Sequence, residues 1–124
     1  MNGKGDKFLI DTNIIIYSAK DKLNLYNFLN VEDNLYISSI TYIEAFGFPF
    51  QETEEEKLCE NIDRLFLTEQ VEKQTILIRK SKKIKLPDAI IAATAIVHDL
   101  TLVTCNSDDF KGISELKILD PFNH

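Results

Sequence analysis

The sequence has few of the residues that build disulfide frameworks or zinc sites. It holds two cysteines and two histidines in 124 residues. Cys59 and Cys105 lie far apart, and neither has a CxxC partner or a histidine nearby. This spacing indicates neither a disulfide framework nor a zinc site, so we expect both thiols to stay reduced.

Long hydrophobic runs are also missing. The longest apolar run, AIIAATAIV from Ala89 to Val97, is far too short to cross a bilayer. The N-terminal stretch MNGKGDK lacks the pattern of a signal peptide. We therefore expect a soluble, cytoplasmic protein that makes no membrane contact.

The chain also lacks an overall excess of positive charge, since its formal net charge is −6. Nucleic-acid-binding domains usually carry a basic surface. Six of the 14 basic residues nevertheless fall between Lys73 and Lys85, a stretch without any acid. A solvated helix face and a phosphate-binding surface both explain such a run. The acidic cluster TEEE at 53–56 is typical of a helix start with a capping box.

Short apolar runs alternate with stretches of helical periodicity. With 44% hydrophobic residues, the chain suits a single domain over 1–124. Strands are predicted at 7–10, 35–38, 101–104 and 116–119, with a further short strand considered near Val71. Helices are predicted at 13–19, 23–29, 40–46, 55–67, 73–84 and 87–98, a loop at Gly47, Pro49 and Gln51, and a turn at Gly112. This alternation predicts a three-layer α/β/α fold with a central parallel sheet of four to five strands.

Several acidic residues stand where strands end or helices begin. Asp11 follows the first strand directly, and Asp88 follows a proline at a helix start in KLPDAIIAATA. Glu44 ends TYIE, while Asp108 and Asp109 follow the strand at 101–104. Each position has a purely structural explanation, as a helix cap, a dipole partner or a turn residue.

Taken together, the acids indicate more than capping. The carboxyl ends of parallel strands share one edge of the sheet, where functional groups gather. We expect Asp11, Glu44, Asp88 and Asp109 to meet there, where clustered anions raise one another's pKa unless a cation compensates. Oxygen ligands suit Mg²⁺ or Mn²⁺. Such an ion supports phosphodiester hydrolysis.

The segments FLIDTN, SSITYIE, KLPDAIIAATA and LVTCNSDDFKGI, followed by LKILDP, resemble the PIN-domain ribonucleases, in particular VapC-type toxins of toxin–antitoxin pairs. The resemblance runs from about Phe8 to Pro121. It implies a Mg²⁺- or Mn²⁺-dependent endoribonuclease in which Asp11 and Asp88 bind metal and Glu44 completes the acidic pocket. The fourth acid would come from NSDDF.

The last acid departs from one common pattern of the family. Many relatives carry aspartate where this chain has Asn106; others have asparagine there and an acid before the phenylalanine, which matches Asp109. Asn106 would then position water or Asp109. Thr12, Asn13 and Thr104 match polar positions of the family, and we expect them to support the site.

The resemblance also implies an RNA substrate, a homodimer and a cognate antitoxin. Lys82, Lys83 and Lys85 are the residues that we expect to hold the RNA backbone. The aromatic residues of AFGFPF, namely Phe46, Phe48 and Phe50, suit either a partner groove or a buried turn.

Two other functions remain open at this point. A phosphoacceptor receiver domain has a similar length and acids at strand ends. Its acceptor aspartate lies near mid-chain and a lysine follows a late strand, whereas this chain carries its most distinctive acid at Asp88, at a helix start, and has no such lysine after TLVT. A PIN-like RNA-binding module without catalysis would keep the fold alone. Metal-dependent RNA cleavage separates these alternatives.

Overall fold

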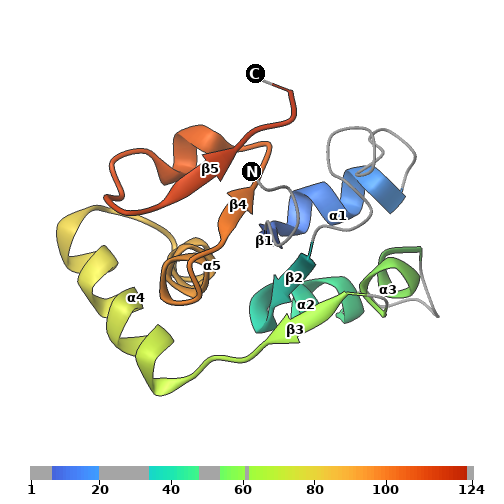
Figure 1. Cartoon of the computed structure of the whole chain (residues 1–124), viewed down its shortest axis with the longest axis horizontal. Helices are drawn as coiled ribbons and strands as arrows, with labels where there is room; N and C mark the ends of the chain where they lie inside the picture. Colours follow the sequence, from blue (N-terminus) through green and yellow to red (C-terminus); the bar gives the residue numbers. More distant parts are fainter. Residues whose placement is uncertain (1–6, 20–33, 48–53, 61, 123–124) are drawn as a thin grey trace.

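Five parallel strands form one central sheet. The computed structural model describes residues 7–19, 34–47, 54–60 and 62–122. The strands run in the order β3-β2-β1-β4-β5 and are β1 (Lys7–Ile10), β2 (Asn34–Ser38), β3 (Asp63–Leu65), β4 (Thr101–Val103) and β5 (Lys117–Leu119). The expected parallel sheet is confirmed (Figure 1).

Helices cover the sheet on its two sides. They are α1 (Thr12–Ala19), α2 (Ser39–Phe46), α3 (Glu54–Cys59), α4 (Glu69–Ser81) and α5 (Leu86–Val97), with a short 3₁₀ helix η2 (Ser107–Phe110). In Figure 1, α4 and α5 lie on one side of the strands and α1 and α3 on the other.

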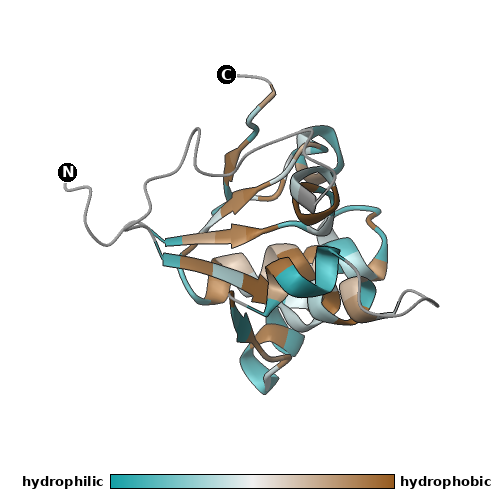
Figure 2. Cartoon of the chain, turned by 90° about the vertical axis from the view of Figure 1, so that its right-hand side faces the viewer, coloured by the Kyte–Doolittle hydropathy of each residue, from teal (hydrophilic) through white to brown (hydrophobic). Residues whose placement is uncertain are grey.

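The strands are buried on both faces. Leu9 packs with α4 and α5 in one core cluster, whereas the next residue, Ile10, packs with α1, α2 and α3 in a second. Leu102 and Val103 divide in the same way. Successive side chains of a strand point to opposite faces, so short uniformly apolar runs are what a sheet covered on both sides requires. Figure 2 shows these mostly hydrophobic strands edge to edge.

The predicted helix over 55–67 is wrong in its second half. The helix ends at Cys59, and Asp63–Leu65 form the edge strand β3, paired with β2 through Tyr36↔Asp63 and Ser38↔Leu65. Three residues are too few to show alternation, so pairing with a neighbour decides their structure.

The short strand considered near Val71 is also wrong. Val71 is fully buried in α4, and its backbone N–H donates to the side chain of Thr68, the N-cap of that helix, at 3.3 Å. The predicted helix at 73–84 therefore begins earlier, at Glu69, and ends at Ser81.

The other predicted strands are confirmed to within a residue or two, as are the helices at 13–19, 40–46 and 87–98. Gly47 ends α2, and Gly112 adopts a left-handed φ of 83° at the predicted turn. Predictions for 23–29, Phe48, Pro49, Phe50, Gln51 and the first residue of TEEE lie outside the described residues.

The strand order excludes the receiver alternative. Flavodoxin-like folds, including receivers, have the order 2-1-3-4-5. In this chain β1 lies between β2 and β4, and β3 lies at the edge. In the part of the chain that the structure covers, no helix combines the length and apolar character needed to cross a membrane.

Candidate active site

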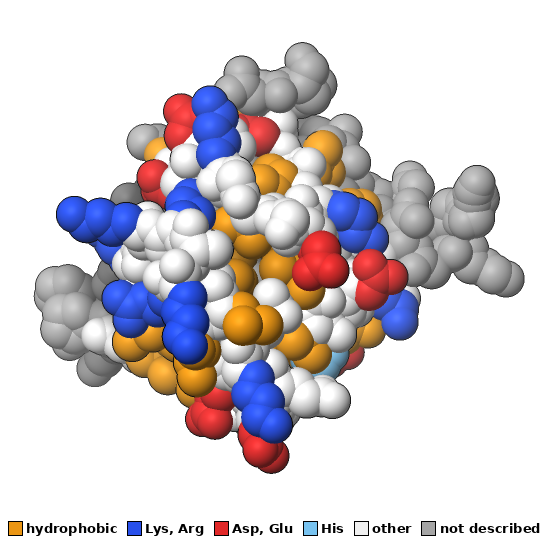
Figure 3. Space-filling model, turned by 90° about the vertical axis from the view of Figure 1, so that its left-hand side faces the viewer, with side chains coloured by type: hydrophobic (Ala, Val, Ile, Leu, Met, Phe, Trp, Pro, Cys, Tyr) orange, Lys and Arg blue, Asp and Glu red, His pale blue; other side chains and the backbone are white. Residues whose placement is uncertain are grey.

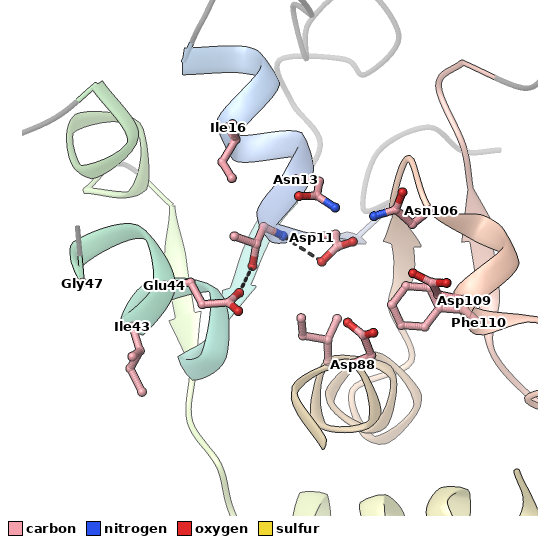
Figure 4. Close-up of a pocket in the computed structure, with 12 residues that line it drawn as sticks. Asp11, Asn13, Ile16, Ile43, Glu44, Gly47, Asp88, Asn106, Asp109 and Phe110 are labelled. Atoms are coloured by element: carbon pink, nitrogen blue, oxygen red, sulfur yellow. Dashed lines mark hydrogen bonds between the residues drawn. The ribbon is translucent and has the colours of Figure 1, made fainter. Parts of the chain in front are cut away.

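The four predicted acids line one open pocket, with a volume of about 530 Å³, at the carboxyl edge of the sheet. Asp11 comes from the end of β1, Glu44 from α2, Asp88 from the start of α5 and Asp109 from η2. Figure 4 shows their side chains around a common space, with Asn13 and Asn106 beside them. The structure thus brings together residues separated by nearly the whole chain.

Asp11 is the most buried of these acids, at 5% exposure. Its Oδ1 accepts a hydrogen bond from the backbone N–H of Thr12 at 2.8 Å, and its Oδ2 accepts one from the Thr104 hydroxyl at 2.7 Å. Its backbone carbonyl accepts from the N–H groups of Ile14 and Ile15, which begin α1. The backbone therefore starts the helix, while the side chain faces the pocket.

The charge of Asp11 is poorly compensated. Burial raises its pKa from 3.8 to about 6, against the lowering effect of its hydrogen bonds from Thr104 and Thr12. The neighbouring charges of Asp88 and Glu44 raise the pKa further. Such an environment favours binding of a cation or a proton.

Thr104 lies fully buried beneath the pocket and does not line it. Its hydroxyl donates to Asp11 and accepts the backbone N–H of Asn106 at 3.0 Å. The supporting role expected of this threonine therefore takes the form of orienting the Asp11 carboxylate from below.

Glu44 lies at the pocket, and the alternative explanation for it, a helix cap, is wrong. The N-cap of α2 is Ser38, whose hydroxyl accepts the backbone N–H of Thr41 at 3.2 Å, so TYIE is not a capping box. Oε1 of Glu44 instead accepts a hydrogen bond from the Thr12 hydroxyl at 2.5 Å (Figure 4). Buried Thr41, which sequence reasoning missed, lies 3.0 Å from the same hydroxyl. In the sequence, Thr41 could have been noticed only as a polar residue on the apolar face of the predicted helix.

Asp88 lies in the first turn of α5, behind Pro87, as the sequence predicted. Among the described residues its carboxylate has no hydrogen-bond partner, and Lys85, the N-cap, makes no side-chain cap. Burial raises the pKa of Asp88, and the charges of Asp109 and Glu44 add to this, while Lys85 lowers it. A carboxylate used only to cap the helix would be bonded to backbone N–H groups.

The two adjacent aspartates of NSDDF differ in their surroundings. Asp109 lines the pocket, whereas Asp108 is 86% exposed and forms an ion pair of 3.2 Å with Lys111. Asn106 also lines the pocket, and its carbonyl accepts the N–H of Asp109 at 3.0 Å. The geometry therefore favours Asp109 as the fourth acid.

The donor set fits a hard divalent cation in part. Carboxylate and amide oxygens are the ligands that Mg²⁺ and Mn²⁺ prefer. Within the described ranges, no three acidic, histidine or cysteine side chains are placed to hold one ion together. Mg²⁺ usually binds one or two carboxylates and keeps several waters, so the open pocket suits an ion that stays partly hydrated.

A second hollow of about 500 Å³ adjoins the acidic pocket and shares Asp88 and Asp109 with it. Its basic side chains come from the predicted cationic run, and they are Arg79, Lys82, Lys83 and Lys85. Lys82 is half-buried, and its Nζ donates to the backbone carbonyls of Asp109 and Lys111 at 3.2 and 2.6 Å. The predicted RNA-binding lysines therefore lie beside the acids, but one of them is engaged within the fold.

Comparisons with known proteins agree with this geometry. The family model described as "PIN domain" matches residues 8–116. A toxin–antitoxin complex from Klebsiella pneumoniae shares 30% identity with a TM-score of 0.70, covering 91% of this chain and 96% of that one. VapBC-1 from nontypeable Haemophilus influenzae shares 30% identity with a TM-score of 0.73, covering 92% and 97%.

DNA-bound VapBC from Salmonella typhimurium shares 27% identity with a TM-score of 0.74, covering 93% of this chain and 98% of that one. The comparison with curated proteins found no match. The family model covers most of the chain, and the solved relatives share its fold. The chain therefore belongs to the PIN domain family, as a member of the VapC type.

Proposed function

We propose that the protein is a Mg²⁺- or Mn²⁺-dependent endoribonuclease and the toxin of a toxin–antitoxin pair. The observation that carries the proposal is the convergence of four carboxylates on one open pocket, with the Asp11 pKa raised to about 6. A buried structural acid would be paired with a cation, whereas the charges acting on Asp11 are Asp88 and Glu44, both negative.

The pocket residues would have two roles in such a reaction, metal binding and proton transfer. Asp11, Asp88 and Asp109 would hold the ion, one or two of them directly and the rest through its bound waters. When bound, the ion makes water a better nucleophile and stabilises charge on a phosphoryl group. Glu44, whose Oε1 accepts the hydrogen bond from Thr12, would take a proton from the attacking water through its other oxygen.

The nuclease proposal is tested with purified protein and single-stranded RNA. Cleavage should require Mg²⁺ or Mn²⁺, stop with a chelator, and be lost in Asp11→Asn and Asp88→Asn. Glu72→Gln is the control, because it removes an exposed acid of α4 that lines neither the acidic pocket nor the second hollow. Equal cleavage by wild type and both pocket variants would show that a contaminant acts. Metal-independent RNA binding without cleavage would favour the non-catalytic module.

The basic hollow supports RNA as the substrate. Arg79, Lys83 and Lys85 are exposed, and the hollow that they line reaches Asp88 and Asp109. Lys83→Gln and Lys85→Gln should each weaken RNA binding and reduce its salt slope by about 1. Lys73→Gln serves as a control, because this exposed lysine of α4 pairs with Glu69 and does not line the hollow. An unchanged salt slope in the first two variants contradicts a phosphate contact.

We also propose a cognate antitoxin and a homodimer. Relatives at 27–30% identity were crystallised as toxin–antitoxin or VapBC assemblies. Among the described residues, seven large hydrophobic side chains are at least 45% exposed, and they are Ile43, Phe66, Leu67, Ile76, Leu77, Leu86 and Phe122. Figure 3, a view onto the side where α4 lies in Figure 1, shows hydrophobic side chains among lysines and arginines.

Phe46 contributes less to such a surface than the sequence suggested, because it is half-buried and its ring lies 4.5 Å from that of Tyr42. Light scattering of the purified protein tests the dimer, and a monomer at high concentration would contradict it. Induction in cells should arrest growth, whereas Asp88→Asn should not, and co-expression of a neighbouring antitoxin gene should restore growth. A cytoplasmic location stays a prediction.

A further inference from the structure

Lys82 is the member of the basic run whose ammonium is used within the fold. It follows α4 directly, and its backbone N–H donates to the Ile78 carbonyl at 3.1 Å. Its Nζ reaches across to the η2 segment and donates to two carbonyls, those of Asp109 and Lys111. These two residues lie 27 and 29 positions further along the chain.

The two carbonyls stand at the end of a helical turn, where backbone oxygens lack helical partners. A cation at a helix C-terminus satisfies these oxygens and interacts favourably with the dipole. Hydrogen bonds from a charged donor are about twice as strong as those between neutral groups. The ammonium therefore fixes the turn from the side of α4.

This turn carries a pocket acid. On one side of Asp109, Phe110 is anchored in the core at 2% exposure. At Asp109 itself, the backbone carbonyl is held by Lys82 and the backbone N–H by the Asn106 carbonyl. The backbone is thus held on both sides while the carboxylate points into the pocket (Figure 4).

The neighbouring cations differ from Lys82 in this respect. Arg79, Lys83 and Lys85 are exposed, and none of them has a hydrogen-bond or ion-pair partner among the described residues. An ammonium that already donates to two carbonyls has one donor left for a phosphate. Arg79, Lys83 and Lys85 are therefore available to a ligand, whereas Lys82 links α4 to the η2 segment.

We propose that Lys82 is a positioning residue that holds Asp109 at the acidic pocket, rather than an RNA contact. The proposal rests on the nuclease function proposed above. The segments that it joins are the α4–α5 connection, which leads to Asp88, and the η2 turn, which carries Asp109.

The first test needs neither metal nor RNA. Amide hydrogen exchange over residues 106–111 is compared in Lys82→Met, which keeps most of the side-chain stem, Lys82→Arg, which keeps charged donors, and Lys83→Met. Exchange should speed up in Lys82→Met alone. Wild-type exchange rates in Lys82→Met would overturn the proposal, because the hydrogen bonds of Lys82 would then not stabilise the η2 turn.

The second test measures Mn²⁺ affinity without RNA, by calorimetry. Lys82→Met should bind Mn²⁺ about 10-fold more weakly, at the low end of effects for groups that orient metal ligands, and Lys82→Arg should recover most of this. Lys83→Met should bind Mn²⁺ like wild type but bind RNA more weakly. If Lys82→Met binds Mn²⁺ normally and instead loses RNA affinity with a smaller salt slope, Lys82 is a phosphate contact. Absence of Mn²⁺ binding by wild type would refute the nuclease proposal, while the exchange result would still decide whether Lys82 fixes the turn.

Discussion

Asp11→Asn should make the metal-free protein more stable at neutral pH, although it removes a residue proposed for catalysis. Burial raises the pKa of Asp11 from 3.8 to about 6. Each pKa unit corresponds to about 1.4 kcal/mol, so ionised Asp11 destabilises the folded state by about 3 kcal/mol. A neutral side chain of the same shape avoids this cost of burying a charge.

The amide keeps most of the hydrogen bonds of Asp11. Its oxygen can accept from the backbone N–H of Thr12, and its nitrogen can donate to the Thr104 hydroxyl, which now lacks an acceptor for its own proton. An unmade hydrogen bond of this kind costs about 1 kcal/mol. The expected gain in the free energy of unfolding is therefore about 2 kcal/mol.

The gain should depend on pH in a defined direction. Above about pH 6, Asp11 is ionised in both the folded and the unfolded state, and the full destabilisation is present. Between about 6 and 3.8, the folded state binds a proton that the unfolded state does not, so wild-type stability rises as the pH falls. Below 3.8 both states are protonated, and the advantage of the asparagine disappears.

Urea unfolding followed by circular dichroism measures the effect, with a chelator present, at several values from about pH 7.5 down to about pH 4. Asp108→Asn should change the free energy of unfolding by less than about 0.5 kcal/mol at every pH, since its ion pair is exposed. Excess Mg²⁺ should stabilise wild type but not Asp11→Asn. The reasoning is refuted if Asp11→Asn is no more stable than wild type at neutral pH, or if the difference is independent of pH.

Three further substitutions test the support of the pocket. Thr104→Val should cost about 2 kcal/mol of stability, because it leaves a buried carboxylate short of a donor, and an unchanged urea midpoint would contradict this. Phe110→Ala should cost about 3–5 kcal/mol in the same assay, since its ring is 2% exposed in the core that anchors η2; a loss below about 1 kcal/mol would rule out that anchoring role. Thr12→Val should leave the free energy of unfolding within about 1 kcal/mol of wild type. It should lower the RNA cleavage rate, because Glu44 loses its hydrogen bond from Thr12. A cleavage rate equal to that of wild type would count against Glu44 as a catalytic group.

The sequence predicted those parts of the fold that local pattern determines. In the strand Lys7–Ile10 the residues after the lysine are apolar, with Leu9 and Ile10 buried on opposite faces of the sheet. Pro87 marks the start of α5. The strand Asp63–Leu65 could not be predicted, because its pairing with β2 is a tertiary interaction of three residues. Its polar first residue and its nearness to α3 made continuation of the helix look reasonable.

The same limit applies to the site. Asp11, Asp88 and Asp109 could be predicted because each follows a strand or lies near the start of a helix, positions that parallel topology brings together. Glu44 lies in the second half of α2, away from such a position. Their partners could not, since the contacts of Glu44 with Thr12 and of Lys82 with Asp109 join residues 32 and 27 positions apart. A glutamate three residues after a threonine has the spacing of a cap, and a lysine in a basic run has the pattern of a ligand contact; only tertiary structure distinguishes these roles.

The hydrogen bond between Asp11 and Thr104 spans 93 residues, and the β1–β4 pairing beside it closes a loop of similar size. Contacts of such long range slow folding, because the entropy of closing the loop is lost before the contact forms. During translation, the first strand and its aspartate leave the ribosome long before their partner has been made. The acidic pocket is thus incomplete on every nascent chain until the segment carrying Asp109 has emerged.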